Sequence, residues 1–205
     1  MNIIVIGGGP SGMMSAIKAK EAGHHVTLFE RNQQLGKKLL ATGNRRCNIT
    51  NNKPSQQLIK AIHNGKFLYS MFNQFDVQSI IEFFSSYNLQ FHEEEDNKMY
   101  PITNRSHDVL DVLKKALNDN RVEVKYNSLV ESITIEDDCV KSVTVNKKIY
   151  PCDHLIVATG GVSFPFFGSD GLMHEHLNAH NITSTPLYAC EAPLLSNDKR
   201  ITSLD

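Results

Sequence analysis

The chain has 205 residues, of which 40% are hydrophobic, and its formal net charge is −1 at pH 7. This composition is typical of a soluble globular protein of one or two domains, and no stretch approaches the ~20 apolar residues of a membrane span. Because the chain also lacks a wide basic stripe and interleaved aromatic residues, we expect a small-molecule substrate, no nucleic-acid or membrane partner, and an undetermined oligomeric state.

The first thirty residues contain a strand, a glycine-rich turn, a helix and a second strand. An apolar strand over 2–6 leads into residues 7–12, which read Gly-Gly-Gly-Pro-Ser-Gly. A helix is expected over 11–22, and the second strand, over 25–29, is followed directly by the acid Glu30. Strand, turn, helix and acid in this order are the fingerprint of a dinucleotide-binding unit.

Each position of this fingerprint has an expected task. Gly7 makes the tight turn, Gly9 lets the backbone approach a pyrophosphate, and Gly12 lets the helix pack closely on the sheet. Ser11, the first residue of the expected helix, and Pro10, which precedes it, lie where unpaired N–H groups meet the phosphates. Glu30 is expected to bind the hydroxyls of the adenosine ribose.

The second half of the chain predicts the rest of the sheet. A short strand is expected over 121–125, an antiparallel meander over 129–136, 140–146 and 148–150, and a buried parallel strand over 153–158. The predicted fold is α/β, a doubly wound Rossmann-like domain with strand order 3-2-1-4 and the meander as the crossover to the fourth strand.

This arrangement resembles the FAD-binding domains of the glutathione-reductase type. In that arrangement the turn, Glu30 and the end of the last strand meet at one groove. Ala158, Thr159 and Gly160 are therefore expected to contact the cofactor, and Val130, which opens the meander, to contact adenine through its backbone.

A narrower resemblance lies in residues 35–51, which read Leu-Gly-Lys-Lys-Leu-Leu-Ala-Thr-Gly-Asn-Arg-Arg-Cys-Asn-Ile-Thr-Asn. The segment resembles Gly-(Lys/Arg)-Lys-x-x-x-(Ser/Thr)-Gly-x-Gly-Arg-Cys-Asn-x-(Ser/Thr)-Asn. That pattern marks a bacterial family of NAD(P)/FAD-dependent oxidoreductases of the aminoacetone-oxidase-like type. Further agreement comes from Tyr100-Pro101, Ala158-Thr159-Gly160-Gly161 and Gly168-Ser169, so that the resemblance extends from Asn2 to about Leu194.

The same segment also suits a polyanionic cofactor on physical grounds. Lys37, Lys38, Arg45 and Arg46 place four cations near the expected phosphate turn, and short polar side chains lie among them. A solvated basic loop and a nucleic-acid patch are the alternatives. The candidate cofactor contacts in this segment are Lys38, Thr42, Gly43, Asn44, Arg46, Cys47 and Asn48. Arg31, which lies after the second strand, is a further candidate.

Cys47 and the histidines of the last helix allow two interpretations each. Cys47 next to Arg46 could be a redox partner of a flavin, but no second cysteine lies nearby in sequence, so we favour a small residue packed in a cofactor loop.

His176 and His180 lie four residues apart in a helix expected over 171–181. We expect no metal there, because no nearby acid or cysteine completes a site.

The chain departs from the family pattern at several points. A family glycine is Arg45 here, and a positive φ at that position would cost about 1 kcal/mol or more. Members of the family continue through a substrate domain, which predicts that this chain is an N-terminal fragment. We expect an incomplete FAD-binding domain over 1–185 and the start of a truncated substrate domain over 186–205.

These expectations predict a cytoplasmic FAD-dependent oxidoreductase acting on a small organic substrate, with NAD(P)H as a candidate electron donor and with the fragment alone inactive. The resemblance implies either oxidation of a small amine or reduction of an unsaturated substrate, and no catalytic residue can be named. An NAD-dependent dehydrogenase and a non-catalytic nucleotide-binding module are the alternatives.

Overall fold

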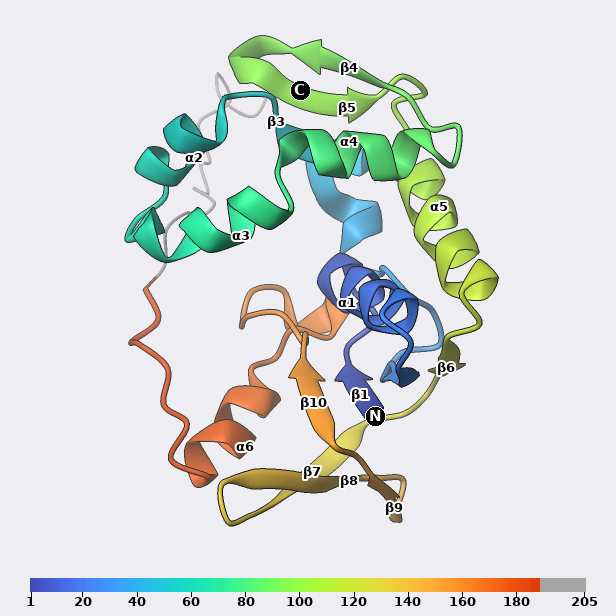
Figure 1. The fold of residues 1–205 in the computed structure, drawn as a ribbon, viewed down its shortest axis with the longest axis vertical. Helices are drawn as coiled ribbons and strands as arrows, with labels where there is room; N and C mark the ends of the chain where they lie inside the picture. The colour runs from blue at the N-terminus through green and yellow to red at the C-terminus, as the bar shows by residue number, and fades with distance from the viewer. Residues whose placement is uncertain (189–205) are drawn as a thin grey trace, which may run out of the picture.

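A computed structural model describes residues 1–188 (Figure 1). Its centre is a parallel sheet of four strands, β1 (Asn2–Ile6), β2 (His25–Phe29), β6 (Glu123–Lys125) and β10 (His154–Val157). The strands lie in the order β6-β2-β1-β10. This order confirms the predicted arrangement, since β6 and β10 are the third and fourth strands of the expected sheet.

The alternation of side chains along β1 explains why the sheet is covered on both faces. Ile3 and Val5 point to one face and pack with the helices, whereas Ile4 and Ile6 point to the other face and pack with the meander. All four side chains are buried. A strand with four successive apolar residues is therefore stable only between two layers, as parallel strands usually are.

The helical layer consists of α1 (Pro10–Glu21) and α5 (Ser106–Asp119), which pack against each other and, through α1, against β2. Val109 and Leu113 on α5 and Met13 and Ile17 on α1 are all but inaccessible to solvent. The helix α5 alternates buried and exposed positions with helical period, so its apolar stripe faces α1 and the central sheet.

The opposite face of the sheet is covered by the predicted antiparallel meander of β7 (Val130–Glu136), β8 (Cys139–Val145) and β9 (Lys148–Pro151). The short helix α6 (Leu172–Ala179) joins this layer through Met173. Figure 1 shows the meander and α6 on one side of the central strands and α1 on the other. The meander connects β6 to β10 at the opposite edge of the sheet, as expected.

The segment between β2 and α5 forms a second unit beyond α1 (Figure 1). It holds a small antiparallel sheet in the order β3-β5-β4 together with short helices. The elements of this unit are η1 (Leu39–Arg45), β3 (Thr50–Asn51), α2 (Ser55–Ala61), η2 (Gly65–Leu68), α3 (Tyr69–Gln74), α4 (Val77–Ser85), β4 (Phe91–Glu94), η3 (Glu95–Asn97) and β5 (Lys98–Pro101).

No helix among residues 1–188 is long and apolar enough to cross a membrane.

Two predicted strands of the central sheet are shorter than expected: the strand expected over 153–158 is β10, which spans His154–Val157, and the strand expected over 121–125 is β6, which spans Glu123–Lys125. Residues 121 and 122 were expected in the strand that is β6, but Arg121 adopts a φ of 54° and closes the turn after α5 by donating to the carbonyl of Asn118. A residue in the left-handed region cannot continue a strand. The loop 158–171 after β10 contains one more short helix, η4 (Pro165–Phe167).

Candidate dinucleotide-binding site

A cleft of about 590 Å³ opens at the C-terminal ends of β1, β2 and β10. Ligands of open parallel sheets bind at this edge, because the connections on either side diverge there. Most of the predicted contacts line this cleft, although they come from distant parts of the sequence. They are Gly7, Gly9, Pro10, Ser11, Glu30, Arg31, Lys38, Val130, Ala158, Thr159 and Gly160.

The glycine-rich turn has the geometry that the sequence predicted. Gly7 adopts a φ of 104° and donates its N–H to the carbonyl of Phe29 at 2.8 Å. A Cβ on Gly12 would lie 1.9 Å from the carbonyl oxygen of Gly7, so only glycine lets α1 come this close to the turn. A Cβ on Gly9, in contrast, would meet no atom within 4 Å. Gly9 therefore faces open space at the start of α1.

That open space is suited to a phosphate group. The first N–H groups of a helix have no partner within the helix, and the positive end of the helix dipole points the same way. Pro10 occupies the first position of α1, and Ser11, which is exposed, follows it. The donor set and the empty cradle at Gly9 fit a pyrophosphate.

Glu30 is buried at the end of β2, and the protein itself supplies three donors to its carboxylate. One oxygen, Oε2, accepts the N–H of Gly8 at 2.6 Å, and the other, Oε1, accepts the backbone N–H and the side-chain amide of Asn32, each at 2.7 Å. An ionised carboxylate has about four acceptor sites. One acceptor site on Glu30 thus remains for a hydroxyl in the cleft.

The middle glycine of the turn has a role that the sequence analysis missed. A Cβ on Gly8 would lie 2.3 Å from Cδ2 of Leu35 and 2.8 Å from Oε2 of Glu30. The segment after β2 thus lies directly on the turn, and Gly36 donates its N–H to the carbonyl of Gly8 at 2.8 Å. The turn is held from the side of β2 as well as from α1.

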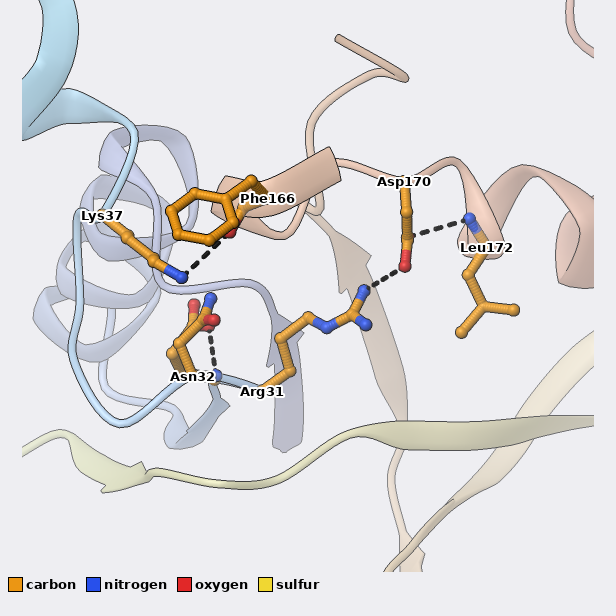
Figure 2. Close-up of polar contacts among 7 residues, drawn as sticks. Arg31, Asn32, Lys37, Phe166, Asp170 and Leu172 are labelled. Carbon is orange, nitrogen blue, oxygen red and sulfur yellow. Dashed lines mark hydrogen bonds and ion pairs between the residues drawn. The ribbon is translucent and has the colours of Figure 1, made fainter. Parts of the chain in front are cut away.

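Three cations beside the cleft contact the loop 160–171, which follows β10. Figure 2 shows Arg31 reaching Asp170 and Lys37 reaching Phe166. The Nη1–Oδ2 distance of the first pair is 2.6 Å, and Nζ of Lys37 donates to the Phe166 carbonyl at 2.9 Å. Nζ of Lys38 donates to the carbonyl of Ser163 at 3.0 Å. Arg31 and Lys38, predicted to contact the cofactor, thus line the cleft while contacting protein groups.

The structure does not bring the predicted contacts of the segment 42–48 into the cleft lining. They lie beyond Lys38, on η1 and the loop that follows it, where Thr42 Oγ1 donates to the carbonyl of Leu39 at 2.7 Å. Their role in cofactor binding stays a prediction. These residues are Thr42, Gly43, Asn44, Arg46, Cys47 and Asn48.

Arg46 is held by groups of the second unit. Its guanidinium lies 4.2 Å from the ring centroid of Tyr100, and Nε donates to Oδ1 of Asn104 at 2.9 Å. Nη2 forms an ion pair with Glu94, which also contacts Nε2 of His92 at 3.0 Å. The hydrogen bond from Arg46 is the main reason that the pKa of Glu94 lies below its ordinary value.

Cys47 is buried in the core beneath η1, and this burial raises the pKa of its thiol. A thiol whose pKa is raised is a poor nucleophile. This supports the interpretation of Cys47 as a packed residue over its interpretation as a redox partner.

Arg45, close to Cys47 in sequence, adopts a φ of 67°. The position at which the family has a glycine therefore lies in the left-handed region.

Several residues of the cleft had no signal in the sequence alone. Asn32 and Ser128 flank the expected elements, and Asp170 lies in the loop after the last expected strand. Their position depends on contacts between distant segments. The further lining residues not predicted include Gly8, Asn32, Lys37, Ser128, Ser169, Asp170 and Met173.

His180, which directly follows α6, contacts the protein. Its Nε2 lies 3.0 Å from the carbonyl oxygen of Ile133. In the part of the chain that the structure describes, no three His, Cys, Asp or Glu side chains are grouped so that they could hold a metal ion.

Comparison with known proteins shows a related family. A family model described as HI0933-like protein Rossmann domain matches residues 1–189. The 3-dehydro-bile acid delta(4,6)-reductase of Clostridium scindens is 31% identical over 188 residues, which are 89% of this chain and 44% of that protein. The ribosomal RNA dihydrouridine synthase of Escherichia coli is 28% identical over 192 residues, 93% of this chain and 47% of that protein. The chain thus spans about half the length of these curated relatives.

A solved structure shows the same fold at lower identity. The 3-ketosteroid-delta4-(5alpha)-dehydrogenase of Rhodococcus jostii RHA1 has a TM-score of 0.57 to this chain at 15% identity, over 78% of this chain and 45% of that one. The match confirms the Rossmann-like arrangement of sheet and helices. Because the family model covers nearly the whole chain, this protein belongs to the HI0933-like family, whose Rossmann domain it contains.

Proposed function

We propose that this chain is the FAD-binding part of a flavin-dependent oxidoreductase. The observation that carries the proposal is the open cradle at Gly9, where the N-terminus of α1 faces a cleft and a side chain on the glycine would meet no atom. Glu30 lies across the turn with one acceptor site left for a ribose hydroxyl. A dinucleotide whose pyrophosphate sits at the turn suits both groups.

FAD rather than NAD is favoured by the layer opposite the helices. The crossover from β6 to β10 is an antiparallel meander, as in flavin-binding domains of the glutathione-reductase type, which supports FAD over the NAD-dependent alternative. Val130, at the start of β7, lines the cleft where adenine would lie. When bound, the flavin supplies the redox chemistry; the residues of this chain bind and orient its nucleotide half.

Reduction of an unsaturated substrate is the reaction that we propose, with NAD(P)H as electron donor. Of the two reactions left open by the sequence, reduction is supported by the relative from Clostridium scindens, which is a reductase. We propose neither amine oxidation nor the narrower aminoacetone-oxidase-like type. The proposed FAD-binding domain spans 1–185; of the proposed substrate domain, residues 189–205 lie outside the described residues, as does Cys190.

A uracil base in RNA is a second candidate substrate, in addition to a small molecule. Nζ of Lys37 lies 4.7 Å from the ring centroid of Phe166 and Nζ of Lys38 lies 6.0 Å from that of Phe164, and both rings are exposed beside the cleft. Cations interleaved with exposed aromatic rings are typical of single-strand binding, and the Escherichia coli relative is a ribosomal RNA dihydrouridine synthase. The expectation of no nucleic-acid partner therefore stays a prediction.

The cofactor proposal is tested on protein that carries residues 1–205 within its full reading frame. Purified protein is denatured by heat, and the released ligand is separated by chromatography and identified by its absorbance and mass. FAD is the expected product. Recovery of FMN, of NAD, or of no dinucleotide after incubation with excess FAD would contradict the proposal.

The substrate class is tested separately. Filter binding of a single-stranded RNA, with Phe166→Ala for comparison, distinguishes RNA from a small molecule as the substrate.

A further inference from the structure

The loop 160–171 forms one wall of the cleft, opposite the glycine-rich turn. It starts at the end of β10 and ends at α6, and its two ends lie against each other. A Cβ on Gly160 would lie 3.0 Å from Oγ of Ser169, and one on Gly171 would lie 2.8 Å from Cγ1 of Val162. The loop is therefore a compact unit with closed ends, of the kind that frequently has a function of its own.

The loop is attached to the rest of the protein mainly through charged side chains of the segment 31–38. Arg31 pairs with Asp170, and Lys37 donates to the carbonyl of Phe166 (Figure 2). Lys38 donates to the carbonyl of Ser163. Because all three cations come from the segment that follows β2, the contacts join two walls of the same cleft.

Asp170 contacts both Arg31 and the first residue of α6. Its Oδ1 accepts the N–H of Leu172, the first residue of α6, at 3.2 Å, while its Oδ2 pairs with Arg31 at 2.6 Å. Arg31 directly follows Glu30, whose carboxylate holds the N–H of Gly8. The glycine-rich turn, the acid after β2, and the end of the loop are thus joined by consecutive polar contacts.

The backbone of the loop is strained at its tip. Phe164 adopts a φ of 59°, a left-handed conformation that is unusual for a bulky residue, and its ring is exposed. Such a conformation persists only where neighbouring contacts hold it. Lys38 contacts Ser163, the residue before Phe164, and Lys37 contacts Phe166, two residues after it.

We propose that the Arg31–Asp170 pair is a latch that fastens the loop 160–171 across the cleft and so retains a bound dinucleotide. The inference rests on the proposed function, since it concerns the same cofactor site. With the latch closed, the adenosine and pyrophosphate lie between the turn at Gly9 and the wall at Gly168 to Asp170. With the latch open, the wall can move away, and the nucleotide can leave. Asp170 acts here as a positioning residue.

The test compares Asp170→Asn, which keeps the size of the side chain but removes its charge, with Glu21→Gln as the matched control. Glu21 forms an exposed ion pair with Lys18 at 2.8 Å on α1, away from the cleft lining. The rate of FAD release, followed by flavin fluorescence after dilution, should rise about two- to fivefold in Asp170→Asn, the range expected for losing one exposed ion pair. It should stay unchanged in Glu21→Gln, and Asp170→Glu should restore the slow release.

A second readout does not need the cofactor. Chymotrypsin cleaves after aromatic residues that are not followed by proline, and the loop exposes Phe166, which precedes Phe167. Cleavage after Phe166 in FAD-free protein should be faster in Asp170→Asn than in the wild type and in Glu21→Gln. If FAD binds and neither its release nor the cleavage changes in Asp170→Asn, the latch is wrong. If the wild type binds no FAD, the proposed function fails, while the cleavage rates still test the latch.

Discussion

The carboxylate of Glu30 accepts the backbone N–H of Gly8 at 2.6 Å, so that the acid after β2 directly fixes the turn after β1. The two groups are 22 residues apart in sequence and both are buried or nearly so. Because the same carboxylate also accepts two bonds from Asn32, its orientation in the cleft is set before any ligand arrives. Glu30 therefore has a structural task as well as its expected task at the ribose.

We predict that Glu30→Ala weakens FAD binding by about 1–3 kcal/mol, or roughly 5- to 150-fold, because a ribose hydroxyl loses its charged acceptor. The variant should also unfold at a lower temperature than the wild type, since the N–H of Gly8 loses its partner. Isothermal titration with FAD and a thermal melt measure the two effects. Glu21→Ala, on the exposed side of α1, is the control. Unchanged affinity in Glu30→Ala would remove the basis for the ribose contact.

We predict opposite outcomes for the substitution of two glycines of the turn. Gly9→Val should fold with a nearly unchanged melting temperature, because its Cβ enters open space, but it should bind FAD more weakly than Glu30→Ala does. Gly12→Ala should lower stability by about 2 kcal/mol or more, because its Cβ would lie 1.9 Å from the carbonyl oxygen of Gly7. Melting curves and FAD titrations separate the two. A Gly9→Val variant that binds FAD like the wild type would show that the pyrophosphate does not lie there.

The central sheet could be predicted from the sequence because its strands are short apolar runs and few topologies connect them. The crossover rules leave the order β6-β2-β1-β10 as the one compatible with the first βαβ unit and the meander. The glycine-rich turn was predictable for a similar reason, since Gly7 and Gly12 each meet a steric demand that only glycine satisfies. Both the strands and the turn were therefore predictable from residues close together in the sequence.

The contacts of the loop 160–171 could not be predicted in this way. Arg31 and Asp170 are 139 residues apart, and nothing local to either residue points to the other. The same holds for Lys37 and Phe166, which meet only after β10 is placed beside β1. The sequence around the basic segment contains no interleaved aromatic residues. The aromatic rings that lie near its lysines belong to a distant loop. Long-range pairing of exposed side chains leaves no periodic pattern.

We predict that the three thiols among residues 1–188 differ strongly in reactivity. Burial raises the pKa of Cys47 and of Cys152, whereas Cys139 is exposed. Because the thiolate is the reactive form, alkylation at about pH 8 should modify Cys139 at least about tenfold faster than the two buried thiols. Mass spectrometry of digested samples taken over time gives each rate separately. Fast modification of Cys47 in the folded protein would revive its interpretation as a redox residue.

We predict that the ion pair of Arg46 and Glu94 contributes stability that is lost in acid. The hydrogen bond from Arg46, followed by that from His92, lowers the pKa of Glu94 from its ordinary value of 4.5. The unfolded chain therefore binds more protons than the folded protein between the two pKa values. The contribution is complete above the unfolded value and disappears as the pH falls through the folded one.

The measurement is the difference in melting temperature between the wild type and Glu94→Gln. This difference should be largest near about pH 6 and should shrink towards about pH 3. Other acids, among them Asp76 and Glu123, also have lowered pKa values and destabilise both proteins in acid, which is why the difference is the informative quantity. Glu95→Gln, at the exposed neighbouring position, is the control. A difference that does not depend on pH would show that the charge of Glu94 does not stabilise the fold.

Arg45 is the position at which this chain departs from the family glycine, and its φ of 67° allows a direct test of the cost. The left-handed conformation costs an ordinary residue about 1–2 kcal/mol, while glycine adds about 0.5–1 kcal/mol of entropy to the unfolded chain. We therefore predict that Arg45→Gly stabilises the protein by about 0.5–1 kcal/mol, a rise of roughly 1–4 °C in melting temperature for a chain of this size.

Gly43→Ala is the matched comparison for Arg45→Gly, because it makes the opposite change in the same segment. Gly43 adopts a φ of 54°, and its Cβ would lie 3.1 Å from the backbone nitrogen of Asn48 and 3.3 Å from the Tyr100 ring. This variant should therefore melt at a lower temperature than the wild type, through backbone strain and crowding together. If Arg45→Gly also lowers the melting temperature, the Arg45 side chain must contribute more than the strain that its backbone costs, and the segment 42–48 would need its arginine for stability.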